Sequence, residues 1–226
     1  MSNQISSQVL GQLTQDDKFP DWWKSEVIKI PFFDNIELTI SFMDFEPDHD
    51  TTFLQEADQA LTNFFKLNSV YRNSISELAY KNCTEFLDAV GFDEADDKLR
   101  NIKDKHEIWK FIYPSEIYLT KRPYKEKDVY VFIACECEWE QEHGLQLVFR
   151  QGKKLTRISD QDGHLTEADA YDKPDEEDEL LSKFYLTILP SLPPTWVLLQ
   201  VRQDVVTFGC SSLSAAVSAE GILLSF

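Results

Sequence analysis

VYVFIACECEWEQEHGLQLVFRQGKKLTRIS (residues 129–159) is the stretch that decides the fold. It contains three runs rich in β-branched and aromatic residues, each of a length suited to one strand, with polar joints between them. EIYLT (116–120) forms a similar run just upstream. Gly144 and Gly152 stand at the two joints, where a glycine allows the positive φ of a tight hairpin. The sequence therefore predicts four consecutive strands in an antiparallel meander.

The chain before this meander predicts two strands and then a helical region. VIKIPFF (27–33) and IELTISFMDF (36–45) alternate apolar and polar residues closely enough for strands. From Thr52 the apolar residues recur at helical spacing, and Gln55 completes a capping box with Thr52. A helix is therefore expected to begin at Thr52.

Two further helices are expected before the meander. The apolar stripe of the second ends at Gly91, and glycine commonly follows a helix in the left-handed conformation. The third is predicted to begin at Asp93 and to run toward Pro114. Helices over residues 52–112 and strands over residues 116–159 predict an α+β fold, in which an antiparallel β-meander or sheet packs against a helical segment.

Three parts of unequal length are expected along the chain. Residues 1–26 are a polar N-terminal lead, residues 27–189 are the α+β domain with an acidic segment at 160–179, and residues 190–226 are a C-terminal apolar segment. From Ser191 onward only three residues are charged, so the last part is either a buried hairpin with a final strand or an acquired tail. None of its apolar runs approaches the roughly 20 residues that a bilayer requires, so no membrane span is expected.

The chain is strongly acidic. It has 226 residues, with 22 lysines and arginines against 40 aspartates and glutamates, and a net charge of −18. Such a charge repels a phosphate backbone, so nucleic acid is excluded as a direct ligand and a basic partner is favoured. The alternative is that the acidity only maintains solubility.

The expected compartment is the cytoplasm. The first residues lack the basic start, apolar run and small-residue cleavage site of an export signal. Four cysteines are sparse for this length and none has CxxC spacing, so reduced thiols are expected. Cys135 and Cys137 are two apart in one predicted strand, which places both on the same, buried face.

The acidic segment at 160–179 concentrates much of the charge. It has ten acids against one base, Lys173, and therefore a net charge of −9. Like charges repel one another, so such a block is usually a solvated loop, and the alternative is a surface for a basic partner. Neutral replacements at 175–179 are expected to leave folding almost unchanged. The residues expected to bind the partner are Asp160, Asp162, Asp175, Glu176, Glu177, Asp178 and Glu179.

The search for catalytic motifs is mostly negative. Common nucleotide-binding, zinc-protease and hydrolase signatures are absent from the chain. Acids and histidines nevertheless occur near two predicted turns, where they offer oxygen and nitrogen donors for a divalent metal. The alternative is that they cap the turns, and no resident metal or cofactor is expected. This set comprises Glu138, Glu140, Glu142, His143, Asp160, Asp162 and His164.

One run resembles an uncharacterised bacterial domain family. CECEWEQEHGLQLVFRQGKKLTRISDQDGHLTEADAYD (135–172) has the pattern WExEHGLQLVF, then G, then LTRxSxxDGHLT. The similarity covers residues 27–172 and leaves out the segment from Ser191. The glycines and the aspartate of the pattern most simply define hairpin geometry. The motif positions are Trp139, Glu142, His143, Gly144, Asp162, Gly163 and His164.

The resemblance implies a binding function. Proteins of this kind are similar to polymorphic-toxin accessory proteins, which include immunity proteins that neutralise a partner toxin. The resemblance implies no catalytic residue. The expected function is therefore a cytosolic immunity-type protein that binds a basic toxin, for example a nuclease. Two alternatives stay open: a metal-dependent enzyme that uses Glu142, His143, Asp162 and His164, and a housekeeping scaffold. The oligomeric state is left open.

Overall fold

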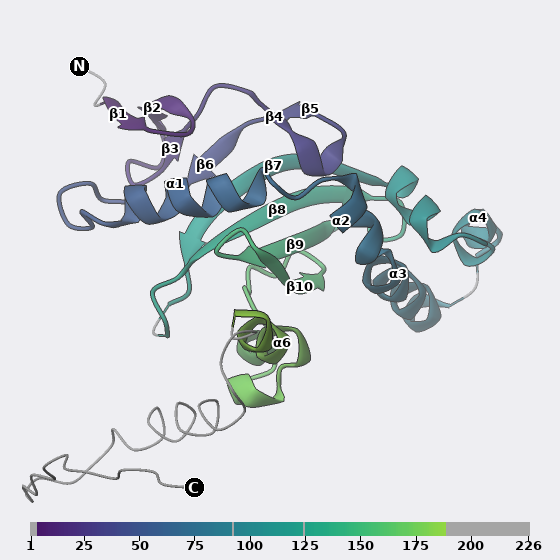
Figure 1. Cartoon of the computed structure of the whole chain (residues 1–226). Helices are drawn as coiled ribbons and strands as arrows, with labels where there is room; N and C mark the ends of the chain where they lie inside the picture. Colours follow the sequence, from purple (N-terminus) through teal and green to yellow (C-terminus); the bar gives the residue numbers. More distant parts are fainter. Residues whose placement is uncertain (1–3, 92, 124, 189–226) are drawn as a thin grey trace, which may run out of the picture. The chain divides into compact units, whose positions relative to one another are not determined.

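The computed structural model describes residues 4–91, 93–123 and 125–188 (Figure 1). In these ranges the strands form one eight-stranded sheet, in the order β1-β2-β3-β6-β7-β8-β9-β10, and a two-stranded hairpin, β4-β5. Neighbours in the large sheet are antiparallel except β6 and β7, which are parallel. The predicted α+β class is confirmed. The strands are β1 (Gln4–Ser7), β2 (Gly11–Gln15), β3 (Trp23–Lys24), β4 (Ile28–Ile30), β5 (Ile36–Leu38), β6 (Ile40–Phe42), β7 (Ile112–Lys121), β8 (Val129–Cys137), β9 (Leu145–Arg150) and β10 (Lys154–Ser159).

The predicted meander is confirmed. β7 pairs with β8, β8 with β9 and β9 with β10, each in antiparallel register. Gly144 (φ 68) lies between β8 and β9, while Gln151 (φ 52) and Gly152 (φ 62) form the turn between β9 and β10. Both joints therefore have the left-handed backbone that the glycines predicted.

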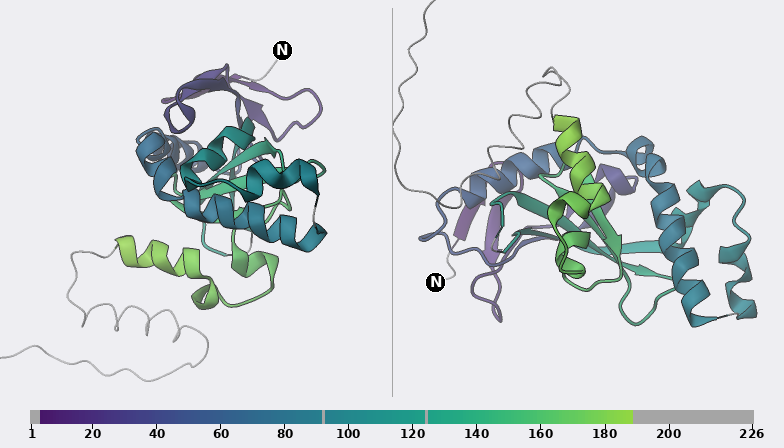
Figure 2. Two further views of the ribbon diagram at one scale, coloured as in Figure 1. Left: turned by 90° about the vertical axis from the view of Figure 1, so that its right-hand side faces the viewer. Right: turned by 90° about the horizontal axis from the view of Figure 1, so that it is seen from below.

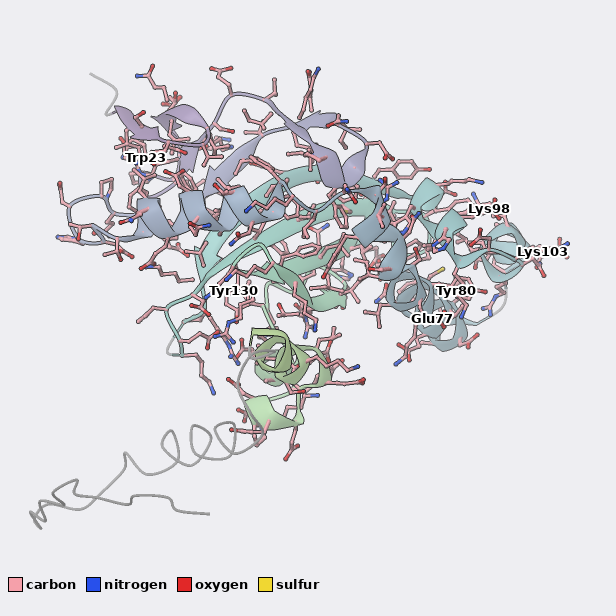
Figure 3. All side chains as sticks on the ribbon, in the orientation of Figure 1. Trp23, Glu77, Tyr80, Lys98, Lys103 and Tyr130 are labelled. Carbon is pink, nitrogen blue, oxygen red and sulfur yellow. The ribbon has the colours of Figure 1, made fainter. Side chains whose placement is uncertain are left out.

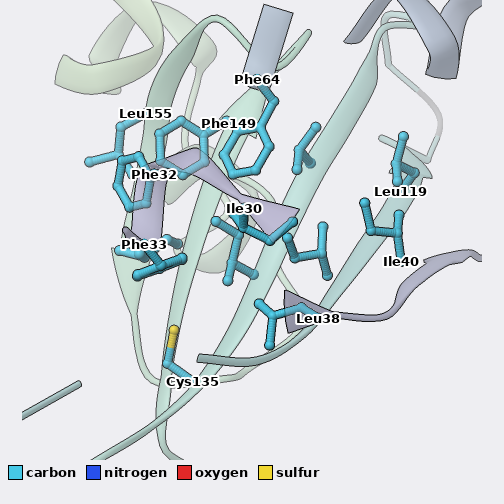
Figure 4. Close-up of a cluster of buried hydrophobic side chains, with 14 of the residues drawn as sticks. Ile30, Phe32, Phe33, Leu38, Ile40, Phe64, Leu119, Cys135, Phe149 and Leu155 are labelled. Carbon is cyan, nitrogen blue, oxygen red and sulfur yellow. The ribbon is translucent and has the colours of Figure 1, made fainter. Parts of the chain in front are cut away.

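Helices cover one face of the sheet (Figures 1 and 2). They are α1 (Phe53–Phe64), α2 (Ser69–Ser74) and α3 (Ser76–Val90), with the 3₁₀ turns η1 (Pro31–Phe33) and η3 (Lys105–Phe111), while η2 (Glu94–Asp96) and α4 (Asp97–Arg100) lie next to α3 (Figure 1). Phe64 of α1 contacts Phe149 of β9, with ring centroids 5.5 Å apart. Phe32 of η1 contacts the same ring at 5.4 Å, so helix, hairpin loop and sheet share one aromatic core (Figure 4).

The helical region differs from the prediction at its boundaries. Thr52 makes no side-chain cap, and the Asp50 carboxylate instead accepts the Phe53 N–H at 3.0 Å. The second predicted helix is divided at Ile75 into α2 and α3. Gly91 follows the last residue of α3 as expected, and its φ of 101 is positive, but its ψ of −169 lies outside the left-handed helical region. The predicted capping box is therefore wrong: Asp50, two residues before Thr52, supplies the side-chain acceptor at the start of α1.

The third predicted helix does not form as one element. Asp93 and Asp104 each accept a backbone N–H two residues ahead, at 2.9 and 3.0 Å, and so start two separate short turns. β7 then begins at Ile112 and contains Pro114, next to which the register shifts in a bulge. A bulge accommodates a residue that has no N–H for the strand ladder.

Residues 4–24 contribute three strands to the large sheet. β1, β2 and β3 pair in turn, and β3 joins them to β6. The sequence predicted only a polar lead at 1–26. In β2 only Leu13 is buried, so the alternation of apolar and polar residues that indicates a strand is weak in this segment. The second predicted strand, 36–45, is likewise two strands: β5 pairs with β4, and β6 belongs to the large sheet.

The chain after β10 covers part of the opposite face of the sheet. It forms α5 (Glu167–Ala170), the 3₁₀ turn η4 (Asp175–Glu177) and α6 (Glu179–Ile188). On β8, Val131 and Ile133 belong to the main core, whereas Tyr130 packs with Val148 and Leu165 in a second, smaller core. Because side chains alternate along a strand, the two cores lie on opposite faces. Leu165 thus anchors the segment after β10 on the face that the helices leave open (Figure 2).

The described cysteines are buried free thiols, as predicted for Cys135 and Cys137. Burial raises the pKa of Cys83 to about 12 and that of Cys137 to about 11, so both are protonated at neutral pH. Cys210 and the predicted C-terminal segment at 190–226 lie outside the described residues. Among the described residues no helix has the length and apolar character needed to cross a membrane.

Candidate functional site

The second half of the sequence motif forms a buried polar network under the loop after β10. Arg157 is 2% exposed, and its guanidinium donates to the Asp162 carboxylate, to Ser159 Oγ at 2.9 Å and to the Thr166 carbonyl at 2.9 Å. An arginine with several acceptors on separate residues fixes the path of the chain that supplies them. The loop at 160–166 is therefore held to the sheet by Arg157.

Gln146 of β9 completes this network. Its fully buried Nε2 donates to Asp162 Oδ1 at 3.1 Å and to the His164 carbonyl at 2.8 Å. Asp162 also accepts the His164 N–H at 2.9 Å, and Gly163 between them has φ 80. Asp162 and Gly163 therefore shape the loop, and His164 contributes its backbone to the network while its side chain is exposed.

The first half of the motif shapes the loop between β8 and β9. Trp139 is buried and donates its indole N–H to Asn82 of α3 at 3.1 Å. Glu140 Oε1 accepts the N–H groups of Glu142 and His143 at 2.9 and 3.2 Å, and both of those residues are exposed. Gly144 follows with positive φ. The carboxylates of Glu140 and Asp162 thus cap the two loops, whereas the side chains of Glu142, His143 and His164 are exposed.

The acids and histidines do not converge. Glu138 pairs with Lys98 and accepts the Tyr113 hydroxyl at 2.6 Å, and these two partners lower its pKa. Glu140 caps its own loop, and Asp162 is bonded to Arg157. In the part of the chain that the structure describes, no three His, Cys, Asp or Glu side chains are placed to hold a metal ion.

The acidic segment is anchored by a buried arginine. Arg122, at the end of β7, has a fully buried side chain. It donates to Asp169 at 2.7 and 2.8 Å and to Asp175 at 2.9 and 2.8 Å, and Glu126 accepts a further bond at 3.2 Å. Bidentate bonds of this kind are stronger than single neutral hydrogen bonds. Arg122 therefore ties η4 and α5 to the meander.

Asp178 is also structural. It is fully buried, and its carboxylate accepts the N–H groups of Ala168 at 3.0 Å and Leu181 at 2.9 Å, so it caps the start of α6. Because Asp175 and Asp178 bind inward-facing groups, we expect neutral replacements at 175–179 to destabilise the fold, in contrast to the expectation from the sequence. The candidate partner-binding acids that are exposed without such a role are Asp160, Glu176, Glu177 and Glu179.

Sequence reasoning missed the arginines. Arg150 of β9 is also buried, and its Nε donates to Asp128 at 2.6 Å and lies 3.7 Å from Glu126. Glu126 thereby joins Arg122 and Arg150 in one charged cluster. The available signal was an arginine inside or next to an apolar strand, because such a residue is buried only when acids pair with it.

Acid is expected to loosen this anchor. Hydrogen bonds from Arg122 hold the pKa of Asp175 below its usual 3.8. At Asp169 burial opposes ionisation, but hydrogen bonds from Arg122 and Thr166 outweigh it, so this pKa is also lowered. A carboxyl with a lowered folded-state pKa contributes stability above its unfolded pKa and loses that contribution as the pH falls through its folded pKa. The free energy of unfolding in urea is therefore expected to fall steeply below about pH 4.

Asp175→Asn is the comparison variant for this prediction. It removes one of the two shifted carboxyls and should therefore make the acid-induced loss of stability shallower. Identical slopes below about pH 4 for the wild type and the variant would show that Asp175 is not held by Arg122.

A groove at the other end of the sheet is a second candidate site. It has a volume of about 580 Å³ and lies between the loop at 16–22 and the loop at 44–50. The Phe45 N–H donates to the Asp21 carbonyl at 2.8 Å, and the Trp23 indole donates to the Phe45 carbonyl at 3.1 Å, so the two loops are fixed to each other. Figure 3 places Trp23 among β1, β2 and β3, away from Tyr130 and the acidic segment.

Acidic and apolar side chains line this groove. Asp21, Glu46 and Asp48 supply carboxylates, and Glu46 pairs with His49. No sequence pattern predicted this groove, although DDKFPDWW and FEPDHD both combine aromatic residues with acids. The lining residues are Ile5, Gln15, Pro20, Asp21, Trp23, Phe45, Glu46, Pro47, Asp48 and His49.

Comparison with known proteins identifies one family. The family model described as "Domain of unknown function (DUF6985)" matches residues 9–165. This range includes β2, β3 and the meander, and it ends in the loop that Arg157 and Gln146 hold. No curated protein and no solved structure matches the chain. Because the matched residues make up more than half of the sequence, the chain belongs to the family of the domain of unknown function DUF6985.

Proposed function

We propose that this chain is a cytosolic immunity-type protein that binds a basic partner protein, a toxin such as a nuclease, and blocks its activity. The observation that carries the proposal is the distribution of charge. The net charge is −18, and three arginines, Arg122, Arg150 and Arg157, are buried against acids and add no positive charge to the surface. The surface is therefore strongly negative, which favours encounter with a basic protein.

The resemblance of the motif to accessory proteins of polymorphic toxins supports a toxin as the partner. A nuclease has a basic cleft that binds phosphates, and a negative surface competes for that cleft without any catalytic group. Within the motif run, Glu140, Gln146 and Arg157 form hydrogen bonds to other groups of the chain. This structural role of the motif is compatible with a protein that acts by binding.

The metal-dependent enzyme is less well supported. It required Glu142, His143, Asp162 and His164 to converge, whereas Asp162 is bonded to Arg157 and the His143 ring lies beside Glu140. A housekeeping scaffold stays as the alternative. The immunity function and the scaffold function are distinguished by co-expressing the chain with the protein encoded by the neighbouring gene. Restored growth and a co-purified complex would support the proposal. The absence of both effects would contradict it.

The exposed acids of the acidic segment are expected to speed this association. Glu176→Gln/Glu177→Gln should lower the association rate constant several-fold at low salt and leave the dissociation rate almost unchanged. The measurement is stopped-flow binding to the co-expressed toxin. Raising the salt should reduce the wild-type rate toward that of the variant, since surface charges are screened over about 8–10 Å at physiological ionic strength.

Glu176→Asp/Glu177→Asp is the matched control, because it changes the same side chains and keeps their charge. It should associate at the wild-type rate. If the neutral variant and this control associate equally fast at low salt, the acidic segment does not steer the partner.

A further inference from the structure

Residues 166–179, here called the strap, lie between two apolar anchors. Leu165, directly before the strap, belongs to the second, smaller core, and Leu180, directly after it, packs against the main core. No residue of the strap belongs to either cluster, and its only buried apolar side chain is that of Ala168. The strap is therefore fixed at its ends by apolar contacts and along its length by polar ones.

The polar contacts of the strap centre on Arg122. Among the described residues the Arg122 guanidinium makes five hydrogen bonds. Four of them form bidentate pairs with Asp169 and Asp175 of the strap, and the fifth goes to Glu126. A hydrogen bond in the fold replaces one to water, so it contributes much less than its strength in isolation. The strap can therefore separate from the sheet while both apolar cores stay closed.

The charge of the strap opposes its attachment. It has eight acids and one lysine, in a chain whose net charge is −18. Asp172, Glu176 and Glu177 are exposed. Like charges in one segment repel one another and also repel the rest of an acidic chain. This repulsion favours the state in which the strap is released into water.

Release of the strap would uncover a positive site at the end of the meander. Of its described partners Arg122 would keep only Glu126. Arg150 belongs to the same cluster, where it pairs with Asp128 and lies 3.7 Å from Glu126. Lys125, which lies 3.7 Å from a strap carboxylate, adds a third basic side chain. The site would then have more basic than acidic groups and a planar guanidinium with free donors.

The family match separates this site from the group that fills it. The basic residues of the site lie within residues 9–165, and the strap begins directly after that range. The site is thus part of the domain that the family model describes, whereas Asp169 and Asp175 come from the chain beyond it. Two carboxylates held by an arginine in this way have the chemistry of a ligand that the same chain supplies.

We propose that Arg122 is the centre of a binding site for an acidic peptide, and that the strap occupies this site as an intramolecular ligand until such a peptide replaces it. Carboxylates of the peptide take the places of Asp169 and Asp175. A nucleic acid is a poorer ligand, because a long run of phosphates is repelled by a chain with a net charge of −18. The inference is independent of the proposed function, since it concerns a ligand of the opposite charge.

The test uses the full chain and, as the probe, a fluorescent peptide with the sequence ADAYDKPD of residues 168–175. Asp169→Asn/Asp175→Asn weakens the hold of Arg122 on the strap, so this variant should bind the peptide with a Kd at least about tenfold lower than the wild type. Adding Arg122→Met to the variant should raise the Kd again by about tenfold or more. Equal binding by the wild type and the double variant, or no effect of Arg122→Met, would overturn the inference.

A second peptide shows whether carboxylates are recognised. It has asparagine at the two positions that correspond to Asp169 and Asp175, and it should bind the double variant about tenfold more weakly than the first peptide. If both peptides bind equally well, the site does not recognise carboxylates and the inference is wrong. Asp175→Asn alone replaces the double variant if the latter is poorly folded.

Amide hydrogen exchange tests release of the strap in the wild type. The Ala168 N–H donates to Asp178 at 3.0 Å and the Asp169 N–H to Thr166 Oγ1 at 3.1 Å, so both report on the attached strap. The first peptide at about 10 mM exceeds the millimolar effective concentration of a short tethered segment and should speed their exchange several-fold. The amides of β8 and β9 should be unaffected. Exchange of the strap amides that the peptide does not change, or that is as slow as in β8 and β9, would overturn the inference.

Discussion

Replacing Arg122 by alanine is expected to lower the free energy of unfolding by about 3–5 kcal/mol, because it leaves carboxylates facing one another around an emptied, buried position. The side chain of Arg122 is fully buried, whereas Asp169, Asp175 and Glu126 around it are about a quarter exposed or less. Urea unfolding at neutral pH measures the change. The substitution should also loosen the segment after β10, because Asp169 and Asp175 belong to that segment.

Lys125→Ala is the matched control, because Lys125 also lies near Asp175, at 3.7 Å, but is about half exposed. Its loss should cost less than about 1 kcal/mol, the usual contribution of an exposed pair. The variant Arg122→Met/Asp169→Asn/Asp175→Asn should regain much of the stability lost in Arg122→Ala, because it removes two of the unpaired charges. Equal stability of Arg122→Ala and Lys125→Ala would show that the buried cluster does not hold the segment.

The sequence predicted the meander well for a physical reason. The strands from β7 to β10 lie within one continuous stretch, and among these four the neighbours in the sheet are also neighbours along the chain. Short joints with Gly144 and Gly152 then leave little choice of register. Local pattern and final structure therefore agree in this part of the molecule.

The N-terminal half was harder to predict because its partners are distant. β6 lies parallel to β7, with Ile40 opposite Ile117, and no local pattern indicates a pair so far apart in sequence. β2 buries only Leu13 and thus lacks the alternation of a strand that packs on a core. Such segments become strands because a neighbouring edge satisfies their backbone groups.

The partners of the acids were hard to predict for a similar reason. The block at 160–179 looks uniformly acidic along the sequence, but Arg122 and Arg157 come from the sheet and pair with particular acids of the block. The groove is formed by two loops, at 16–22 and 44–50, that meet only in the fold. Charge counted along the chain does not reveal which acids remain on the surface.

Gly152→Ala is expected to lower the free energy of unfolding by about 3–5 kcal/mol, because a steric clash adds to an unfavourable backbone conformation. Gly152 has φ 62, and a Cβ there would lie 2.9 Å from the carbonyl carbon of Ala60 and 3.0 Å from the Phe64 nitrogen. Both atoms belong to the backbone of α1, which cannot move aside as a flexible side chain does. Urea unfolding, with circular dichroism as the signal, measures the loss.

Gly163→Ala separates the two causes. Gly163 also has a positive φ, 80, but a Cβ there would meet nothing within 4 Å. This control should cost only the backbone strain, about 1 kcal/mol. The difference between the two variants then measures how closely α1 packs on the β9–β10 turn, a contact that Asn63 reinforces by donating to the Gln151 carbonyl at 3.0 Å. Similar losses in both variants would mean that α1 does not press on this turn, and the close packing of helix and meander would then be wrong.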